Sequence, residues 1–260
     1  MKRDNIEDIY ELSPLQQGML FHTLLAPGSG MYFEQVASTI NGALDTAAFE
    51  RSWQTVIDRH TILRTSFHWT KLAKPLQVVY RRVKLPVHYL DWSSLSESAF
   101  NERLESHLKK DREQGFDLSE PPLLRLSVIL KGRDSRVILL SLHHLLLDGW
   151  SSSLVYKEAQ SLYESYVRGE DLQLPKCRPY GDYIAWLQKQ DTDAAEAYWR
   201  SRLRGYTGPP PLGVGLPPGS RHEAAEYDTC ESRVPPTITD AIRRLARTSG
   251  LTLNTIVQGA

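Results

Sequence analysis

The stretch at residues 141–151 reads SLHHLLLDGWS and links a predicted strand to a predicted helix. The apolar run at residues 137–142 leads into it and predicts a buried strand that ends at two histidines, His143 and His144. An acid, a glycine and an aromatic residue follow, and then a serine-rich segment that is predicted to begin a helix. Ionisable residues between a strand and a helix often form part of a functional site.

Neighbouring side chains on a strand point to opposite faces, so we expect one of His143 and His144 to face the core and the other a cavity. The same geometry argues against both rings binding one metal ion. The sequence also holds no His-Glu-x-x-His pair and no spaced set of cysteine and histidine ligands. We therefore expect no metal site. An imidazole facing a cavity can instead take a proton from a nucleophile or position that nucleophile.

Asp148 has two possible roles beside these histidines. It can orient the reactive ring, as in a hydrolytic triad, or it can pair with a buried arginine and hold the loop. Arg64 is the candidate partner, although a solvated charge at the end of a strand is an equally common state for arginine. No Gly-x-Ser-x-Gly elbow supplies a serine nucleophile, so the sequence favours direct transfer without a covalent enzyme intermediate.

The residues after Asp148 suggest how an acyl group could be stabilised. Gly149 would let its backbone approach a ligand closely, and Ser151 is predicted to cap the following helix. The N–H groups at the start of that helix would then lie near the reactive histidine, where they could stabilise a developing oxyanion.

Composition excludes several classes of protein. The 260 residues suffice for one large domain or two lobes, and the 31 basic and 31 acidic residues balance. No basic block indicates nucleic-acid binding, and no apolar run is long enough to span a membrane or to act as a signal peptide. The two cysteines, Cys177 and Cys230, form no disulfide framework, so a cytoplasmic location is expected.

Helical and strand patterns alternate along the chain. Residues 1–11 are expected to be a linker or an extended lead-in, and residues 208–219 a proline- and glycine-rich surface loop. Strands are predicted at residues 34–41, 59–67, 76–80, 87–90, 124–130, 137–142 and 225–234. Helices are predicted at residues 14–25, 46–57, 96–112, 151–166, 180–203 and 237–249, and again from 252. This order predicts an α/β sandwich with one mixed sheet and helices packed against it.

Four segments resemble, in order, motifs of the condensation domains of nonribosomal peptide synthetases, members of the superfamily of chloramphenicol acetyltransferase. They are residues 13–20 (SPLQQGML), 59–67 (RHTILRTSF), 143–149 (HHLLLDG) and 180–186 (YGDYIAW). One such motif is only moderately specific, but four in order are strong support. The resemblance implies an acyltransferase-like lobe at residues 1–175. Residues 176–260 would then hold a connecting helix and the beginning of an incomplete second lobe.

The resemblance also implies a reaction, in which the amine of a carrier-bound acceptor attacks a carrier-bound donor thioester and an amide forms. His144 would contact the amine, His143 would support it, Gly149 would line the reaction centre, and Asp148 would pair with Arg64. Both substrates would be attached to phosphopantetheine arms of donor and acceptor peptidyl carrier proteins. An adenylation domain would adjoin the domain, and the domain itself would bind no cofactor.

Other activities share parts of this pattern. Epimerisation domains carry the same His-His-x-x-x-Asp-Gly signature, but residues 12–19 and the continuation into Trp150 and Ser151 look more like condensation. A heterocyclising relative would have aspartate in place of His143. A free-standing acyltransferase that uses coenzyme A is less favoured, because the sequence holds no second-lobe signature that would support this activity. The chain could also be a non-catalytic docking module for carrier proteins, although an intact His144 disfavours this.

Overall fold

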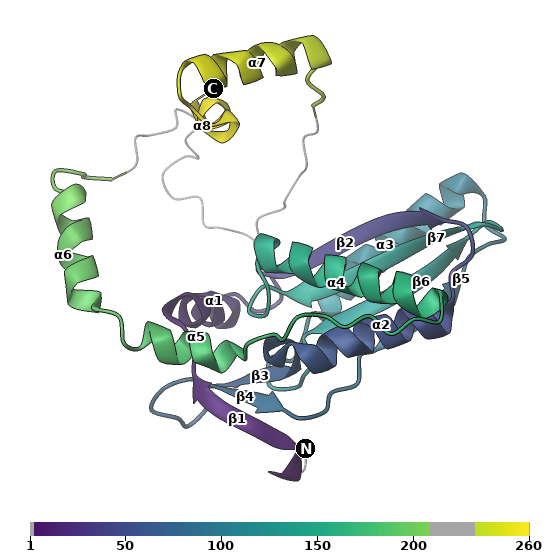
Figure 1. Ribbon diagram of the computed structural model, residues 1–260, viewed down its shortest axis with the longest axis horizontal. Coiled ribbons are helices and arrows are strands. Elements are labelled where there is room, and N and C mark those ends of the chain that lie inside the picture. Colours follow the sequence, from purple (N-terminus) through teal and green to yellow (C-terminus); the bar gives the residue numbers. More distant parts are fainter. Residues whose placement is uncertain (1–2, 209–231, 260) are drawn as a thin grey trace. The chain divides into compact units, whose positions relative to one another are not determined.

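The computed structural model describes residues 3–208 and 232–259 of the chain. The chain divides into two compact units, residues 1–207 and 208–260, which we describe separately. The elements of the larger unit carry the candidate site (Figure 1). None of the helices in the described segments is long and apolar enough to cross a membrane.

The larger unit contains a mixed sheet of four strands in the order β2-β7-β6-β5. Their bounds are β2 Phe33–Asn41, β5 Val87–Asp91, β6 Leu124–Lys131 and β7 Ser135–His143. β7 runs antiparallel to β2 and β6, and β5 runs parallel to β6. The register pairs Phe33 with His143 and Leu124 with Leu142. One end of the sheet therefore brings together the starts of β2, β5 and β6 and the two histidines at the end of β7.

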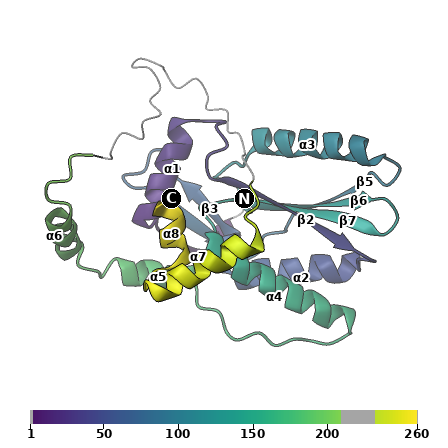
Figure 2. The same ribbon diagram turned by 90° about the horizontal axis from the view of Figure 1, so that it is seen from above.

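Helices cover both faces of this sheet (Figure 2). The helix α3 (Glu97–Gln114) lies on one face, and α2 (Thr46–Arg59) and α4 (Gly149–Val167) lie on the other. Side chains along each strand alternate between the two faces of the sheet, so the core is divided in the same way. Leu126 and Leu140 pack in the cluster that includes α2 and α4. Ile129 and Val137 pack instead against Phe100 of α3. The predicted mixed sheet flanked by helices is confirmed.

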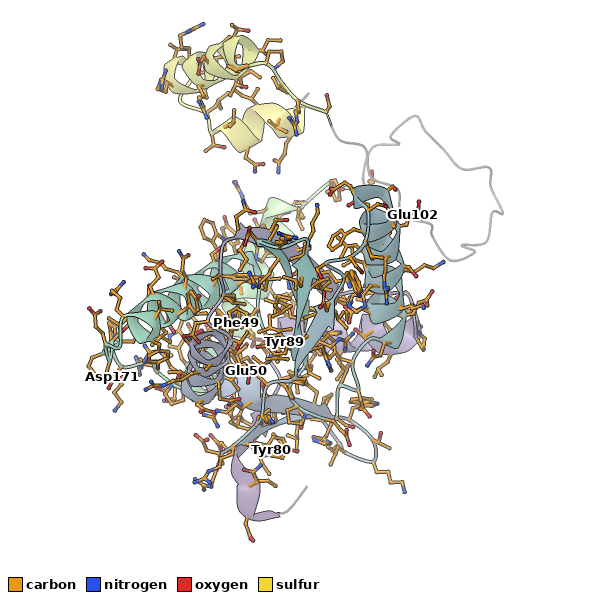
Figure 3. All side chains as sticks on the ribbon, turned by 90° about the vertical axis from the view of Figure 1, so that its right-hand side faces the viewer. Phe49, Glu50, Tyr80, Tyr89, Glu102 and Asp171 are labelled. Atoms are coloured by element: carbon orange, nitrogen blue, oxygen red, sulfur yellow. The ribbon has the colours of Figure 1, made fainter. Side chains whose placement is uncertain are left out.

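Polar contacts also hold the helices on the sheet. Tyr89 of β5 donates a hydrogen bond to Glu50 of α2 at 2.9 Å (Figure 3). On the other face, Asp111 of α3 accepts from Arg125 Nε at 2.6 Å and from the hydroxyl of Ser141 at 2.5 Å. Burial raises the pKa of Asp111, but these two hydrogen bonds, the positive charge of Arg125 and a third hydrogen bond from Gln35 together outweigh it, and the pKa ends below its usual value.

The remaining strands form a second sheet, so the prediction of a single sheet is wrong. Its order is β1-β4-β3, all antiparallel, with β1 Ile6–Glu11, β3 Thr65–His68 and β4 Leu76–Tyr80. The expected lead-in at residues 1–11 supplies β1, which follows the short 3-10 helix η1 (Arg3–Asn5) and pairs Ile6 with Tyr80. β1 is half-exposed and carries charges, so its composition does not distinguish it from a linker.

The helix α1 (Pro14–Leu25) begins as its sequence predicts. The Ser13 hydroxyl accepts from the backbone N–H of Gln16 at 3.2 Å, and Gln16 Oε1 accepts from the Ser13 N–H at 3.0 Å. This reciprocal pair is a capping box. Asp45 caps α2 in a similar way by accepting from Ala48.

The predicted helix at residues 180–203 is two helices, α5 (Tyr180–Leu187) and α6 (Thr192–Arg202). Asp191 interrupts the pattern because its side chain caps α6, accepting from the Ala194 N–H at 2.9 Å. α5 lies against β1, and a Cβ atom added at Gly181 would lie 3.1 Å from the Tyr10 ring. This close approach favours a glycine inside the fourth motif, because a larger residue would push against the Tyr10 ring.

The smaller unit contains α7 (Pro236–Thr248) and α8 (Leu253–Gly259), and both predicted helices are confirmed. Gly250 follows α7 with a φ of +63°, which suits its predicted role as a stop. The hydroxyl of Thr252 caps α8 by accepting from the Thr255 N–H at 3.1 Å. Most of the strand predicted at residues 225–234 lies outside the described residues, and residues 232–234 are not in a strand.

Candidate active site

His143 is the last residue of β7 and is 3% exposed. Its Nδ1 atom accepts a hydrogen bond from the Leu145 N–H at 3.2 Å, so the ring proton lies on Nε2. Nε2 is buried and has no partner within the described residues. Burial, with a smaller effect of the His144 charge, lowers the pKa of His143 to about 4. His143 is therefore a neutral core residue at neutral pH.

His144 follows the strand and is partly exposed, with 27% of its side chain accessible. Its backbone N–H donates to Tyr32 O at 2.8 Å, which fixes the residue against the start of β2. The ring bridges two groups: Nδ1 lies 2.7 Å from Leu147 O, and Nε2 lies 2.8 Å from Glu34 Oε1. One buried and one accessible histidine is the arrangement that strand alternation predicts.

The partners of His144 determine where protons lie. A carbonyl oxygen only accepts, so Nδ1 must donate its proton to Leu147 O. A carboxylate also only accepts, so a hydrogen bond from Nε2 to Glu34 Oε1 requires a proton on Nε2 as well. His144 and Glu34 therefore form a pair that can hold one proton between them at the end of the sheet.

Two tyrosines surround this pair. Tyr32 has a φ of +64°, a conformation that a bulky residue rarely adopts, and its ring centre lies 6.5 Å from that of His144. Tyr156 of α4 has a buried hydroxyl without a hydrogen-bond partner in the described residues. Burial and, to a smaller extent, the Glu34 charge raise the pKa of Tyr156, so its hydroxyl keeps its proton.

Glu34 and Tyr32 were not singled out from the sequence. Glu34 lies at the start of β2, where only β-branched residues marked a strand, and Tyr32 lies in the turn just before it. Their position beside His144 depends on the pairing of β2 with β7. The one available signal is a charged residue at the edge of a predicted strand, which is common in solvated strands as well.

Asp148 does not pair with Arg64, and this prediction is wrong. Asp148 is exposed and is itself the cap of α4, accepting from the Ser151 N–H at 2.8 Å and from the Ser151 hydroxyl at 2.6 Å. These hydrogen bonds lower its pKa. Ser151 is thus the third residue of the helix and not its cap. The Asp148 carboxylate already accepts hydrogen bonds from the first turn of α4. A substrate oxyanion at this helix start would therefore compete with it for the same donors.

Arg64 ends the 3-10 helix η2 (Thr61–Arg64) and is 5% exposed. Its Nη1 atom donates to Glu7 Oε2 at 2.7 Å and to the carbonyl of Tyr80, and its Nε atom donates to Ile57 O at 3.2 Å. These contacts direct the guanidinium into the three-stranded sheet. The prediction failed because Glu7 belongs to β1, a segment that was expected to be a linker or an extended lead-in and was given no pairing partner.

The surface next to His144 is open at the start of α4. A Cβ atom added at Gly149 would meet nothing within 4 Å. Trp150 is 86% exposed, and Leu154, one turn later, is 64% exposed. The fold of the described residues therefore explains neither the glycine nor the exposed aromatic residue.

The first motif is connected to the histidine loop. Gln16 is 5% exposed, and its Nε2 atom donates to Leu145 O at 3.1 Å. Its Oε1 atom also accepts from Gln77 of β4 at 3.2 Å. From the sequence, Gln16 is expected to be a capping or surface residue, with the lining of a channel as the less common alternative.

The described part of the chain holds no group of three histidine, cysteine or acidic side chains that could bind a metal ion. What the site offers is a carboxylate–imidazole pair, a neutral phenol and an open helix start. Such a set can bind a protonated nucleophile, accept its proton and leave space for an acyl group.

The chain was compared with known proteins. The profile described as "Condensation domain" matches residues 6–260. A linear gramicidin synthase from Brevibacillus parabrevis is 42% identical over 98% of this chain, which spans 3% of that protein. Bacitracin synthase 1 of Bacillus licheniformis is 37% identical over 98% of this chain, which spans 5% of that protein. The chain therefore corresponds to a small part of each of these relatives.

Solved structures give the same fold. The starter condensation domain of rhizomide synthetase RzmA superposes with a TM-score of 0.67 at 21% identity, covering 78% of this chain and 50% of that one. The cyclization-docking bidomain of EpoB from Sorangium cellulosum superposes with a TM-score of 0.63 at 20% identity, covering 78% and 42%. At these identities the likeness concerns the fold alone.

Proposed function

The chain belongs to the condensation-domain family of nonribosomal peptide synthetases, and on that premise we propose that it serves in amide formation. The reaction joins a donor acyl thioester to the amine of an acceptor aminoacyl thioester. The single observation that carries this proposal is the accessible His144 ring, held by Leu147 O and Glu34 at the open end of the sheet.

The chemistry of the reaction suits these groups. An acceptor ammonium must lose one proton before it attacks the donor carbonyl, and a second N–H proton must leave as the amide forms. The pair of His144 and Glu34 takes the first proton, and the leaving thiolate of the donor takes the second. The C–S bond breaks as the C–N bond forms, and no covalent enzyme intermediate is needed.

The other predicted site residues have supporting roles in this proposal. His143 is buried and neutral, so it supports the loop and does not take part in proton transfer. Gly149 keeps the start of α4 open for the reacting groups. Asp148 and Ser151 fix the first turn of that helix. Trp150 and Leu154 would face the part of the domain that completes the reaction chamber.

We propose the same partners that the resemblance implies. Both substrates would be carried on phosphopantetheine arms by donor and acceptor carrier proteins, with an adenylation domain adjoining. Residues 1–175 would form the first lobe, and residues 176–260 would begin the second. The domain would hold no cofactor of its own, and its cysteine usage favours the cytoplasm.

Epimerisation of a carrier-bound aminoacyl group and carrier docking without catalysis are the alternatives. The test uses this chain extended to the complete two-lobe domain, with loaded donor and acceptor carriers, and follows the acceptor arm by mass spectrometry. A mass gain equal to the donor acyl group that is lost in His144→Ala supports condensation. Exchange of the donor α-hydrogen with deuterium, without transfer, points to epimerisation. Carrier binding without either reaction points to docking.

A further inference from the structure

We infer that Glu34 binds the ammonium group of the acceptor and shares with His144 the proton which that group releases. This inference rests on the proposed function, and it adds a residue outside the four sequence motifs. It assigns to the site the chemical class of its nucleophile, a protonated primary amine.

The position of Glu34 follows from the sheet register. Glu34 pairs with Leu142, whose side chain packs in the cluster that includes α4, so Glu34 points to the α4 side of the sheet. There its carboxylate is 36% exposed and contacts Nε2 of His144 at 2.8 Å. Within the described residues it has no other ion-pair or hydrogen-bond partner. No arginine or lysine neutralises it there, so a cationic group can bind.

A substrate ammonium has the donors that this pair lacks. It carries three N–H groups and a positive charge, so it can donate to the Glu34 carboxylate and to Nε2 of His144 at once. Nε2 and the carboxylate lie 2.8 Å apart, so both can accept from one ammonium only when no proton lies between them and they move apart, because the N–H bonds diverge tetrahedrally. Binding therefore occurs to the deprotonated pair. Transfer of one proton then gives a neutral amine and leaves that proton on the pair.

The buried hydroxyl of Tyr156 adds a second polar group on the same side. It has no hydrogen-bond partner in the described residues, and burial and, to a smaller extent, the Glu34 charge raise its pKa, so the phenol stays neutral. A neutral phenol does not neutralise the carboxylate.

The simpler explanation is that Glu34 only orients the His144 ring. The two roles differ in their dependence on the nucleophile. A positioning residue would affect every acceptor equally. An ammonium-binding residue distinguishes an aminoacyl acceptor from the 2-hydroxyacyl acceptor of the same shape, because a hydroxyl group brings no charge and only one donor.

The experiment uses the complete two-lobe domain with a loaded donor carrier. Acceptors are an aminoacyl pantetheine and the matching 2-hydroxyacyl pantetheine, both as non-hydrolysable amide analogues for calorimetry and as thioesters for turnover. The variants are Glu34→Gln and Glu34→Asp. Glu11→Gln is the matched control, because Glu11 also lies on a strand, is 37% exposed and pairs with Lys74.

We expect the unmodified domain to bind the amine analogue more tightly than the hydroxyl analogue and Glu34→Gln to lose this preference. In turnover with the amine, Glu34→Gln should lower kcat/KM by about 100-fold. Glu34→Asp should retain part of the preference, and Glu11→Gln all of it. The inference is overturned if Glu34→Gln weakens the binding of both acceptors equally or changes the binding of neither.

Failure of the proposed function would look different. A domain that transfers no acyl group at all argues against condensation, while calorimetry still reports whether Glu34 selects the ammonium. If Glu34→Gln does not fold, as judged by circular dichroism, Glu34→Asp decides alone. An unchanged preference in that variant, despite a carboxylate one methylene further from His144, overturns the inference.

Discussion

The carboxylate of Glu34 and the imidazole of His144 meet at 2.8 Å, although one comes from the start of β2 and the other from the loop after β7. The antiparallel pairing of Phe33 with His143 brings the two residues together. The imidazole that we propose as reactive is therefore held by an acid that lies outside its own motif.

His144→Ala should abolish amide formation in the complete domain. The loss should be at least about 100-fold in rate, which is the usual contribution of a positioned proton acceptor. The ring is partly exposed and lies outside the core, so the melting temperature should change little. Acyl transfer by mass spectrometry and thermal unfolding measure the two effects. Product formed at the original rate would exclude this role.

Asp148→Ala should destabilise the domain by about 1 kcal/mol, the usual effect of removing a helix cap. An unpaired buried charge would cost about 3–5 kcal/mol, but Asp148 is exposed and bonds only to its own helix. Asp191→Ala removes the equivalent cap of α6 and is the matched control. Urea unfolding of both variants gives the comparison. A loss near the larger value would indicate a partner that these contacts do not include.

Asp111→Ala should destabilise the domain more strongly, by about 3–5 kcal/mol. The change leaves the buried Arg125 without its carboxylate and removes the acceptor of the Ser141 hydroxyl. Urea unfolding of Asp111→Ala and Asp148→Ala tests which variant loses more stability. We expect the larger loss in Asp111→Ala, because Asp111 is buried and Asp148 is exposed. Equal losses in the two variants would contradict it.

Gly149→Ala should separate activity from stability. A methyl group there meets nothing within 4 Å, and alanine favours a helix over glycine by up to about 1 kcal/mol. The stability should therefore stay the same or rise, as in Gly18→Ala, whose surroundings in α1 are equally open. The rate of amide formation should fall by about 100-fold, because the methyl group displaces the reacting groups. Full activity in Gly149→Ala would remove Gly149 from the reaction centre.

Acid should destabilise the domain through His143. Its pKa is about 4 in the folded chain against 6.5 for the free side chain, so the unfolded state binds more protons in this interval. The contribution of the neutral His143 ring to the free energy of unfolding is therefore fully present above pH 6.5. It is lost as the pH falls toward 4, by about 3 kcal/mol in all. Urea unfolding across this range measures the decrease. His143→Gln should lack this part of it, and identical pH dependence in the two chains would contradict the assignment.

The helix starts were predictable because their signals are local. Ser13 with Gln16, Asp45 and Thr252 each cap a helix through a residue three positions away, and all three caps form. Asp191 carries the same signal, but the apolar pattern on both sides of it favoured one continuous helix. The strands of the mixed sheet were predictable as well, since their alternation decides which face is buried.

The long-range pairings could not be predicted in the same way. Arg64 has a partner in β1, and the pairing of β1 with β4, which sets Ile6 opposite Tyr80, brings that strand near it. Glu34 reaches His144 through the register of β2 against β7. No local pattern reports either distance. The composition of both segments suits a solvated strand or linker equally well.

The side-chain amide of Gln16 connects α1 to the loop that carries His144. Its oxygen accepts from the Ser13 N–H and from Gln77 of β4, while its nitrogen donates to the carbonyl of Leu145, the residue next to His144. Exposed apolar side chains such as Leu15 and Phe21 lie on the same helix. Any displacement of α1 would therefore strain the hydrogen bond from Gln16 to Leu145 O, so the position of this helix and that of the loop that carries His144 are coupled through one side chain.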